Sequence, residues 1–271
     1  MPQLESEARD IAAAFVSARR AGHALPAYPG TAPDSLSEAY AVQDAAIALF
    51  GGAVAGWKVG RINPPWLAGL NTTRLAGPIF APSVQPAANG HIPAGEIFAG
   101  GFGAAESEFV FRIGSAPAAG QTSFTAEDAA ALIDTVYCGI EIASSPFAGI
   151  NEAGPRVTIS DFGNNNGLLL GAEIPDWCDA GIENWEVTTF IDGAPVASGT
   201  AAAFPGGPME SVRFLIEHLV SRGLPVTPGL LISSGAVTGV HEVTQGQKVE
   251  ARFGNFAAMR CTISHVGGET L

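Results

Sequence analysis

Three glutamates lie in two short segments that have the composition of buried strands. Glu106 and Glu108 belong to "AESEFVF", and Glu141 belongs to "GIEIAS", where its neighbours on the same face are small. Side chains alternate between the two faces of a strand, so Glu106 and Glu108 share one face. Three converging carboxylates would repel each other by roughly 3–4 kcal/mol per pair at ~4–5 Å and an effective dielectric of ~20. A hard divalent cation such as Mg²⁺ or Mn²⁺, which prefers oxygen ligands, would remove this repulsion.

The spacing of the acids also fits a second interpretation, in which they are solvent-facing residues of an antiparallel sheet. Lys58 favours the first interpretation, because the chain has only two lysines and this one lies in "AGWKVG", between Trp57, Val59 and glycines. A half-buried lysine can bind a substrate carboxylate or, with a lowered pKa, carry a proton. The alternative is a lysine on an edge strand whose ammonium group extends into solvent.

Four helices are predicted by apolar periodicity and by capping residues. A first helix ends at "AGHALP", and a Ser-x-x-Glu capping box at Ser35 opens a second one that runs to Gly51. Thr125 opens a short third helix, and residues 208–222 form a longer fourth one.

Short β-branched or aromatic runs, separated by Gly and Pro, predict the strands that carry the acids and the lysine. An Asp192-Gly193 pair between two alternating runs predicts a hairpin. The runs are "VAGWKVG", "GPIFAPSV", "SEFVFRI", "TVYCGIEIA", "NGLLLG", "WEVTTFIDGAPVASG", "GLLISSGAVTG" and "QKVEARFG". We therefore expect one catalytic domain over residues 1–271, with a helical N-terminal subdomain (1–60) and a β-rich metal-binding core (61–271).

The composition excludes several classes of partner. A formal net charge of −13 argues against binding to nucleic acid or to an anionic membrane. The acidic start "MPQLESEARD" is unlike a signal peptide, and no apolar run approaches ~20 residues, so we expect a cytoplasmic protein. Cys138, Cys178 and Cys261 have no metal-ligand spacing, which predicts buried, inert thiols and no zinc site.

An ordered set of segments resembles the hydratase and decarboxylase branch of the fumarylacetoacetate hydrolase superfamily. The likeness is strongest to 2-keto-4-pentenoate hydratase and 2-oxohepta-3-ene-1,7-dioate hydratase, and it covers nearly the whole chain. The segments are "AGWKVG", "AESEFVF", "GIEIASS", "ISDFGNNNGLLLG", "VASGTAAAFPGGPMESVRFLIEHLVSRGLPVTPGLLISSGAVTG" and "GQKVEARFG".

The resemblance implies an α+β fold with a large mixed β-sheet roll or barrel and a helical N-terminal part. It also implies that Glu106, Glu108 and Glu141 hold Mg²⁺ or Mn²⁺, and that Lys58 contacts the carboxylate of a small 2-oxo acid or assists proton transfer. Asp161 is a further candidate for proton transfer. The asparagines that follow it, Asn164 and Asn165, are candidates for substrate binding.

The sequence departs from the family pattern at two places. Ala81 stands in "GPIFAPSV", where family hydratases usually carry an acid, and asparagines replace the small hydroxyl residues that usually follow Asp161. Three functions therefore stay open. The first is hydration of a 2-hydroxydienoic acid such as 2-hydroxypenta-2,4-dienoate in aromatic-compound catabolism. The second is decarboxylation of a 4-oxalocrotonate-like acid or C–C hydrolysis of a β-diketo acid. The third is a non-catalytic partner subunit.

A closed homo-oligomer is also expected, because the family forms such assemblies. The sequence support for it is the apolar segment "FAGGFG", which we expect to be exposed and to require burial.

Overall fold

The computed structural model describes residues 2–87 and 90–268. These residues form α-helices and two β-sheets, and strands of the two sheets are interleaved along the chain. The helices are α1 (Pro2–Ala21), α2 (Leu36–Phe50), α3 (Ala126–Ala130), α4 (Pro155–Ser160) and α5 (Gly207–Ser221). The strands are β1 (Val54–Arg61), β2 (Arg74–Phe80), β3 (Val84–Pro86), β4 (Ala94–Ile97), β5 (Phe102–Ile113), β6 (Ile133–Ser145), β7 (Asn165–Glu173), β8 (Val187–Ile191), β9 (Ala194–Gly199), β10 (Leu231–Ser233), β11 (His241–Glu242), β12 (Lys248–Phe253) and β13 (Ala257–His265).

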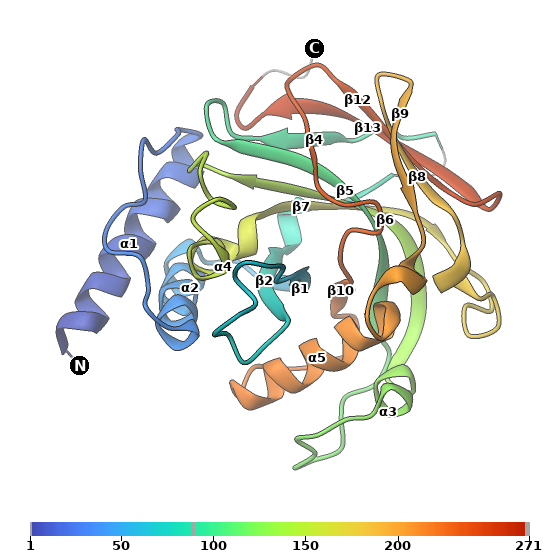
Figure 1. The fold of residues 1–271 in the computed structure, drawn as a ribbon, viewed down its shortest axis with the longest axis horizontal. Coiled ribbons are helices and arrows are strands. Elements are labelled where there is room, and N and C mark those ends of the chain that lie inside the picture. Colours follow the sequence, from blue (N-terminus) through green and yellow to red (C-terminus); the bar gives the residue numbers. More distant parts are fainter. Residues whose placement is uncertain (1, 88–89, 269–271) are drawn as a thin grey trace.

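The larger sheet is mixed and strongly curled. Its strands follow the order β2-β1-β10-β5-β6-β7-β3, and β11 also pairs with β5. A smaller sheet has the order β4-β13-β12-β8-β9. Figure 1 shows α1 and α2 together on one side of the molecule and β8, β9, β12 and β13 on the other. This architecture is the predicted α+β fold.

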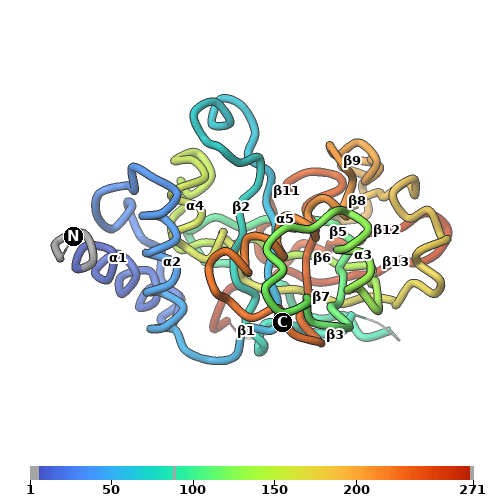
Figure 2. The backbone as a smooth tube through the Cα atoms, turned by 90° about the horizontal axis from the view of Figure 1, so that it is seen from below, coloured from blue at the N-terminus to red at the C-terminus, as the bar shows by residue number. Residues whose placement is uncertain are grey.

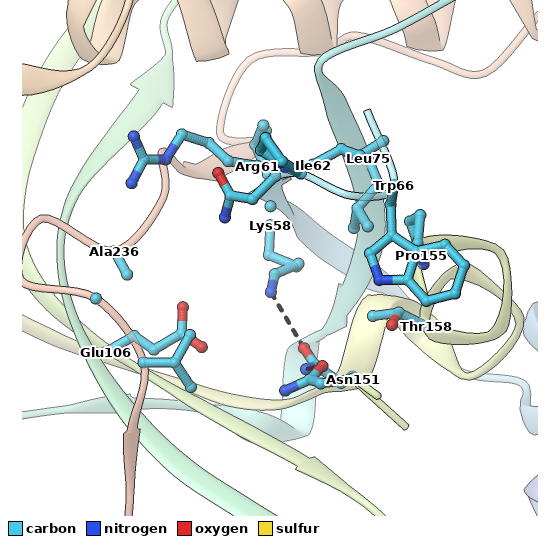
Figure 3. Close-up of a pocket in the computed structure, with 17 residues that line it drawn as sticks. Lys58, Arg61, Ile62, Trp66, Leu75, Glu106, Asn151, Pro155, Thr158 and Ala236 are labelled. Atoms are coloured by element: carbon cyan, nitrogen blue, oxygen red, sulfur yellow. Dashed lines mark hydrogen bonds between the residues drawn. The ribbon is translucent and has the colours of Figure 1, made fainter. Parts of the chain in front are cut away.

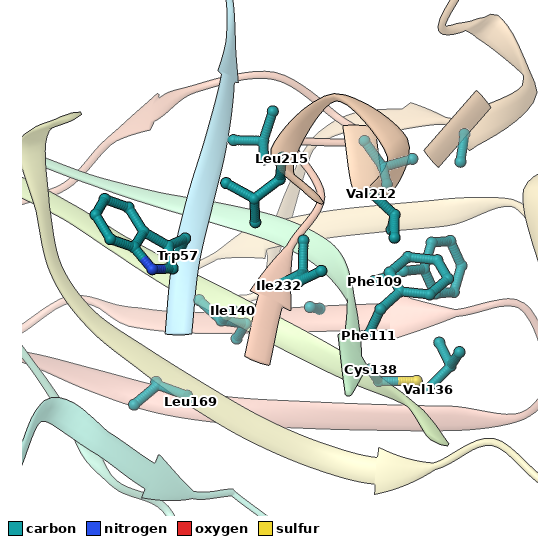
Figure 4. Packing of buried hydrophobic residues seen from close by; sticks show 14 of the residues in the cluster. Trp57, Phe109, Phe111, Val136, Cys138, Ile140, Leu169, Val212, Leu215 and Ile232 are labelled. Carbon is teal, nitrogen blue, oxygen red and sulfur yellow. The ribbon is translucent and has the colours of Figure 1, made fainter. Parts of the chain in front are cut away.

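The two faces of the larger sheet have different compositions, as alternation requires. One face packs Trp57, Phe109 and Ile140 into the main core, together with residues of α5 and of the smaller sheet. Figure 4 shows these side chains between β1, β10 and the strands around them. The opposite face carries Lys58 and the three acids. Every one of these four side chains is buried, so the solvent-facing interpretation of the acids is wrong.

The predicted helices and the hairpin form where local signals placed them. The Ser35 side chain accepts a hydrogen bond from the backbone N–H of Glu38, and Thr125 forms a complete capping box with Asp128. β8 and β9 meet at Asp192-Gly193, and both residues of this turn have positive φ (51° and 82°). Such a turn matches the twist of the paired strands.

Other features differ from the sequence-based expectations. The helical part of residues 1–60 ends at Phe50, because β1 already belongs to the larger sheet. Cys178 is exposed, whereas the other two cysteines are buried as predicted. In "FAGGFG", Phe98 and Phe102 are buried within the chain itself, so these two side chains are not the exposed apolar surface that was expected. Within the described residues no helix is long and apolar enough to cross a bilayer.

Candidate metal centre and substrate cavity

The three predicted metal ligands converge because β5 and β6 pair in one particular register. Glu106 lies directly opposite Glu141, and Glu108 lies opposite Gly139, which has no side chain to separate the acids. One carboxylate oxygen from each acid lies within 4.8 Å of those of the other two. Direct cross-strand neighbours on one face have Cβ atoms about 5 Å apart, which brings their carboxylates into range of a shared ligand.

Each of two acids has one oxygen engaged and one oxygen free. Glu108 Oε2 accepts hydrogen bonds from Ser233 Oγ at 2.6 Å and from the backbone N–H of Gly235 at 2.9 Å. Glu141 Oε1 accepts from Asn165 Nδ2 at 2.9 Å. Glu108 Oε1 and Glu141 Oε2 are buried and have no hydrogen-bond partner among the described residues. Because an unpartnered buried oxygen is costly, this pair of oxygens together with Glu106 fits the donor set of a hard divalent cation.

Burial and mutual repulsion perturb the pKa values of the acids. The pKa of Glu106 is raised to about 7, mainly by burial; the charge of Lys58 lowers this pKa and the charge of Glu141 raises it. The pKa of Glu108 is raised well above its usual range by burial and then by the charges of Glu141 and Glu106. Without a cation, the cluster therefore keeps bound protons near neutral pH, which a metal ion would have to displace.

Lys58 lies next to the acids, with its side chain directed from β1 toward β6. It is 4% exposed, and its Nζ lies 3.3 Å from Glu141 Oε1 and 3.2 Å from Asn164 Oδ1. Burial lowers the pKa of Lys58, but the attraction of the three acids outweighs burial and raises it overall. Lys58 therefore carries its positive charge beside the three acids.

An unusual turn positions the two asparagines. Phe162, Gly163 and Asn164 all have left-handed backbone angles, with φ of 56°, 62° and 59°. Such conformations cost of order 1–3 kcal/mol for a residue other than glycine and persist only where the surroundings hold them. Gly77 on β2 makes room for the turn, since a Cβ at this position would lie 2.0 Å from the carbonyl oxygen of Phe162.

A cavity of about 360 Å³ opens beside this cluster. Lys58, Glu106 and Asn164 form its polar floor. Figure 3 shows Lys58 and Glu106 facing the space, with Arg61 above them and Trp66 on the right. The loop between β1 and β2, which carries Trp66, projects from the body of the molecule in Figure 2.

The structure brings Lys58, the three acids, Asn164 and Asn165 together, but it places Asp161 elsewhere. Asp161 does not line this cavity; its two carboxylate oxygens accept hydrogen bonds from Arg19 at 2.5 and 3.0 Å. This ion pair leaves Asp161 without the access to substrate that proton transfer requires. Ala81 is exposed at the end of β2 and likewise does not line the cavity.

The sequence-based reasoning missed several cavity residues, and Arg61 is the most informative of them. It lies three residues after Lys58 on β1, and its guanidinium carbon lies 4.3 Å from the ring centroid of Phe204. Its side chain is exposed, and among the described residues its guanidinium group has no hydrogen-bond or ion-pair partner. Its position directly after the lysine segment was the available signal. Asn151 and Thr158, which come from the segment around α4, had no such signal.

Comparisons with known proteins identify the fold. No family model matches the sequence, and no curated protein matches it either. Two structures of 4-oxalocrotonate decarboxylase from Pseudomonas putida G7, with calcium and acetate or with magnesium and adipate, are 19% and 18% identical to the chain. Each match covers 96% of this chain and 98% of the decarboxylase, with a TM-score of 0.78.

A hydrolase structure matches a smaller part of the chain. Fumarylpyruvate hydrolase from Pseudomonas aeruginosa, in complex with Mn²⁺ and pyruvate, is 16% identical; the match covers 78% of this chain and 89% of the hydrolase, with a TM-score of 0.57. The chain therefore has the fold of the 4-oxalocrotonate decarboxylase and fumarylpyruvate hydrolase structures, which confirms the fold that the sequence resemblance implied.

Proposed function

We propose that this protein is a divalent-metal-dependent enzyme that decarboxylates a 2-oxo dicarboxylic acid of the 4-oxalocrotonate type. The observation that carries the proposal is the pair of unpartnered buried oxygens on Glu108 and Glu141, next to Glu106 and to the floor of the cavity. Three carboxylates suit Mg²⁺ or Mn²⁺, and structures with the same fold contain calcium, magnesium or manganese. A cation held there would supply Lewis-acid stabilisation of the negative charge that develops on the oxygens of a 2-oxo acid.

The chain's own residues account for binding and orientation of the substrate. Lys58 supplies a compact positive charge at the floor of the cavity, suited to the carboxylate next to the 2-oxo group. Asn164 holds the lysine by accepting a hydrogen bond from Nζ, and Asn151 holds Asn164 through a bond of 2.9 Å. Preorganised groups of this kind stabilise developing charge without having to move during the reaction.

Decarboxylation requires little further chemistry from the protein. The bond to the distal carboxylate breaks, CO₂ leaves, and the electron pair moves along the conjugated chain to the 2-oxo oxygen, which gives a dienolate that takes up one proton. Within the described residues, the ionisable side chains that line the cavity are Lys58, Arg61 and Glu106. None of these is a free base that could activate water, since Glu106 belongs to the metal cradle.

Water addition to a 2-hydroxydienoic acid remains the second candidate, because the sequence resemblance favours hydratases and the reaction uses the same stabilised enolate. The non-catalytic alternative has less support, since both the carboxylate cradle and Lys58 are intact. Assembly into a closed homo-oligomer remains a prediction.

A direct assay separates the two reactions. Purified protein with Mg²⁺ or Mn²⁺ is given 4-oxalocrotonate, with release of CO₂ as the readout, and separately 2-hydroxypenta-2,4-dienoate, with loss of the dienol absorbance as the readout. We expect CO₂ release that requires the metal. Hydration without any CO₂ release would favour the second candidate, and turnover of neither acid would contradict the proposed function.

Arg61 should select substrates that carry a second carboxylate. Arg61 lines the same cavity as Lys58 and carries a second positive charge there, so we expect it to bind the far carboxylate of an extended six-carbon diacid. A charge-assisted hydrogen bond contributes about 1.5–3 kcal/mol. Arg61→Gln should therefore lower kcat/KM for the diacid by about 10- to 150-fold and change that for a monocarboxylic 2-oxo acid by less than about 3-fold.

Arg252→Gln is the control, because Arg252 also lies over an aromatic ring, that of Phe190 at 4.2 Å, and does not line the cavity. Equal losses on both classes of substrate in Arg61→Gln would contradict the selective role.

Metal binding should stabilise the protein more at pH 8 than at pH 6. The folded-state pKa of Glu106, about 7, lies above that of an unfolded glutamate, so the metal-free fold loses stability as the pH rises toward and through 7. A bound cation offsets this loss, and at pH 6 it must also displace a proton. Thermal melts with saturating Mg²⁺ and with chelator should show a larger gain in Tm at pH 8. An equal or larger gain at pH 6 would show that the acids are ionised differently from this description.

A further inference from the structure

Arg19, on the N-terminal helix α1, contacts the segment that carries Asn165, the hydrogen-bond partner of Glu141. Its side chain is 5% exposed and uses all three nitrogens of the guanidinium group. Besides the two bonds to the carboxylate of Asp161, it donates to the backbone oxygens of Ser144 (3.1 Å), Asp161 (3.3 Å) and Asn165 (3.1 Å), and to Asn166 Oδ1 (3.1 Å). The arginine and its partners are more than 120 residues apart in sequence.

The partners of Arg19 lie at both ends of the left-handed turn. Asp161 comes immediately before the turn of residues 162–164, and Asn165 and Asn166 come immediately after it. The face of the guanidinium group also lies over the ring of Phe162, within the turn, at 4.9 Å. Arg19 therefore contacts the beginning, the middle and the end of the turn. These contacts stabilise left-handed backbone angles that are unfavourable on their own.

This turn carries the two side chains that hold the reactive groups. Asn164, the last residue of the turn, accepts from Lys58 Nζ, and Asn165, the next residue, donates to Glu141 Oε1. A hydrogen bond to one oxygen of Glu141 leaves the other oxygen pointing away from Asn165, and that second oxygen is one of the two without a partner. The conformation of the turn thus determines the position of both a metal ligand and the substrate-binding ammonium group.

We propose that Arg19 is a positioning residue: it holds residues 161–166 in the left-handed turn, so that Asn165 orients Glu141 for the metal and Asn164 orients Lys58 for the substrate. The role of Asp161 is then to anchor this arginine. The inference rests on the proposed metal-dependent function, and it makes the N-terminal helix a necessary part of the metal centre.

Only a planar guanidinium group can make all the hydrogen bonds of Arg19 to this turn. A guanidinium group can donate in several fixed directions in one plane, which lets it reach a carboxylate and carbonyl oxygens on two sides at once. A lysine could keep an ion pair with Asp161 but could not span both ends of the turn. Arg19→Lys therefore retains the buried ion pair with Asp161 and removes the hydrogen bonds to Asn165 and Asn166 at the other end of the turn. Its neighbour Arg20 donates to the carbonyl oxygens of Leu49 and Phe50 instead, so Arg20→Lys is a matched control on the same helix.

The test compares full-length native protein, Arg19→Lys and Arg20→Lys. In metal-free protein, amide hydrogen exchange of residues 161–166 should be faster in Arg19→Lys and unchanged in Arg20→Lys. Calorimetric titration with Mn²⁺ should give a Kd up to about 10- to 100-fold higher in Arg19→Lys, which is the typical cost when a metal ligand loses a partner such as Asn165. If Arg19→Lys does not fold, the double variant Arg19→Met with Asp161→Asn, which leaves no unpaired buried charge, takes its place.

Unchanged amide hydrogen exchange in Arg19→Lys would overturn the proposal, because the turn would then be stable without the arginine. Faster exchange with native Mn²⁺ affinity would also overturn it, since Arg19 would then stabilise the turn without affecting the metal site. Failure of the native protein itself to bind Mn²⁺ would instead contradict the proposed function, so the two failures are distinguishable.

Discussion

Glu141→Gln should abolish high-affinity binding of Mg²⁺ and Mn²⁺ while the fold remains intact. Glutamine has the shape of glutamate but lacks its charge, and it replaces one of three carboxylates that lie within 4.8 Å of one another. Loss of a residue that only supports a metal ligand costs about 10- to 100-fold in affinity, so loss of the ligand itself should cost more than about 100-fold. Calorimetric titration with each metal measures the affinity.

The Glu141→Gln variant should still fold, because Lys58 keeps the charges of Glu106 and Glu108 beside it after the ion pair of 3.3 Å is lost. Glu173→Gln is the control, because Glu173 lies exposed at the other end of β7. Native metal affinity in Glu141→Gln would show that the three acids are not the metal centre.

Lys58→Met should lower kcat/KM for the 2-oxo acid by at least about 10- to 150-fold, which corresponds to the loss of one charge-assisted contact. The loss should appear mainly in KM if Lys58 only binds the carboxylate, and in kcat as well if it stabilises the developing charge. Lys248→Met is the matched control, since Lys248 is the only other lysine of the chain and is exposed. Steady-state kinetics of both variants measure kcat and KM separately and so distinguish the two roles.

Lys58→Arg should not restore the activity of the native protein. A Cβ built on Gly163 would lie 3.2 Å from Cδ of Lys58, and one built on Gly60 would lie 3.8 Å from its Nζ, so the space around the side chain fits a narrow ammonium group. The broader guanidinium group would have to move the left-handed turn. Near-native kcat/KM in Lys58→Met would mean that Lys58 is a structural strand residue.

Much of the candidate centre was predictable because it depends on local rules. Strand alternation alone places Glu106 and Glu108 on one face. The scarcity of lysine and the glycine-rich surroundings identified Lys58 as unusual. The helices at Ser35 and Thr125 followed from capping residues, whose hydrogen bonds span only three positions.

Other features depend on contacts between distant segments. Arg19 meets Asp161 across 142 residues, and Ser233 reaches Glu108 across 125 residues. The strand order β1-β10-β5-β6-β7 is not the order of the sequence, so no local pattern indicates which strand lies next to Lys58. For this reason Asp161 read as a candidate for catalysis, although the structure engages it with the N-terminal helix.

The sequence by itself determined which residues could do chemistry here, because residue type and the two-residue period of a strand are properties of the chain alone. Only the tertiary structure decided which of them lie together. The register that sets Glu106 opposite Glu141, the left-handed turn that carries Asn164 and Asn165, and the buried ion pair of Arg19 with Asp161 are examples. Each depends on long-range packing, which compensates locally unfavourable conformations and buried charges that no short segment could maintain.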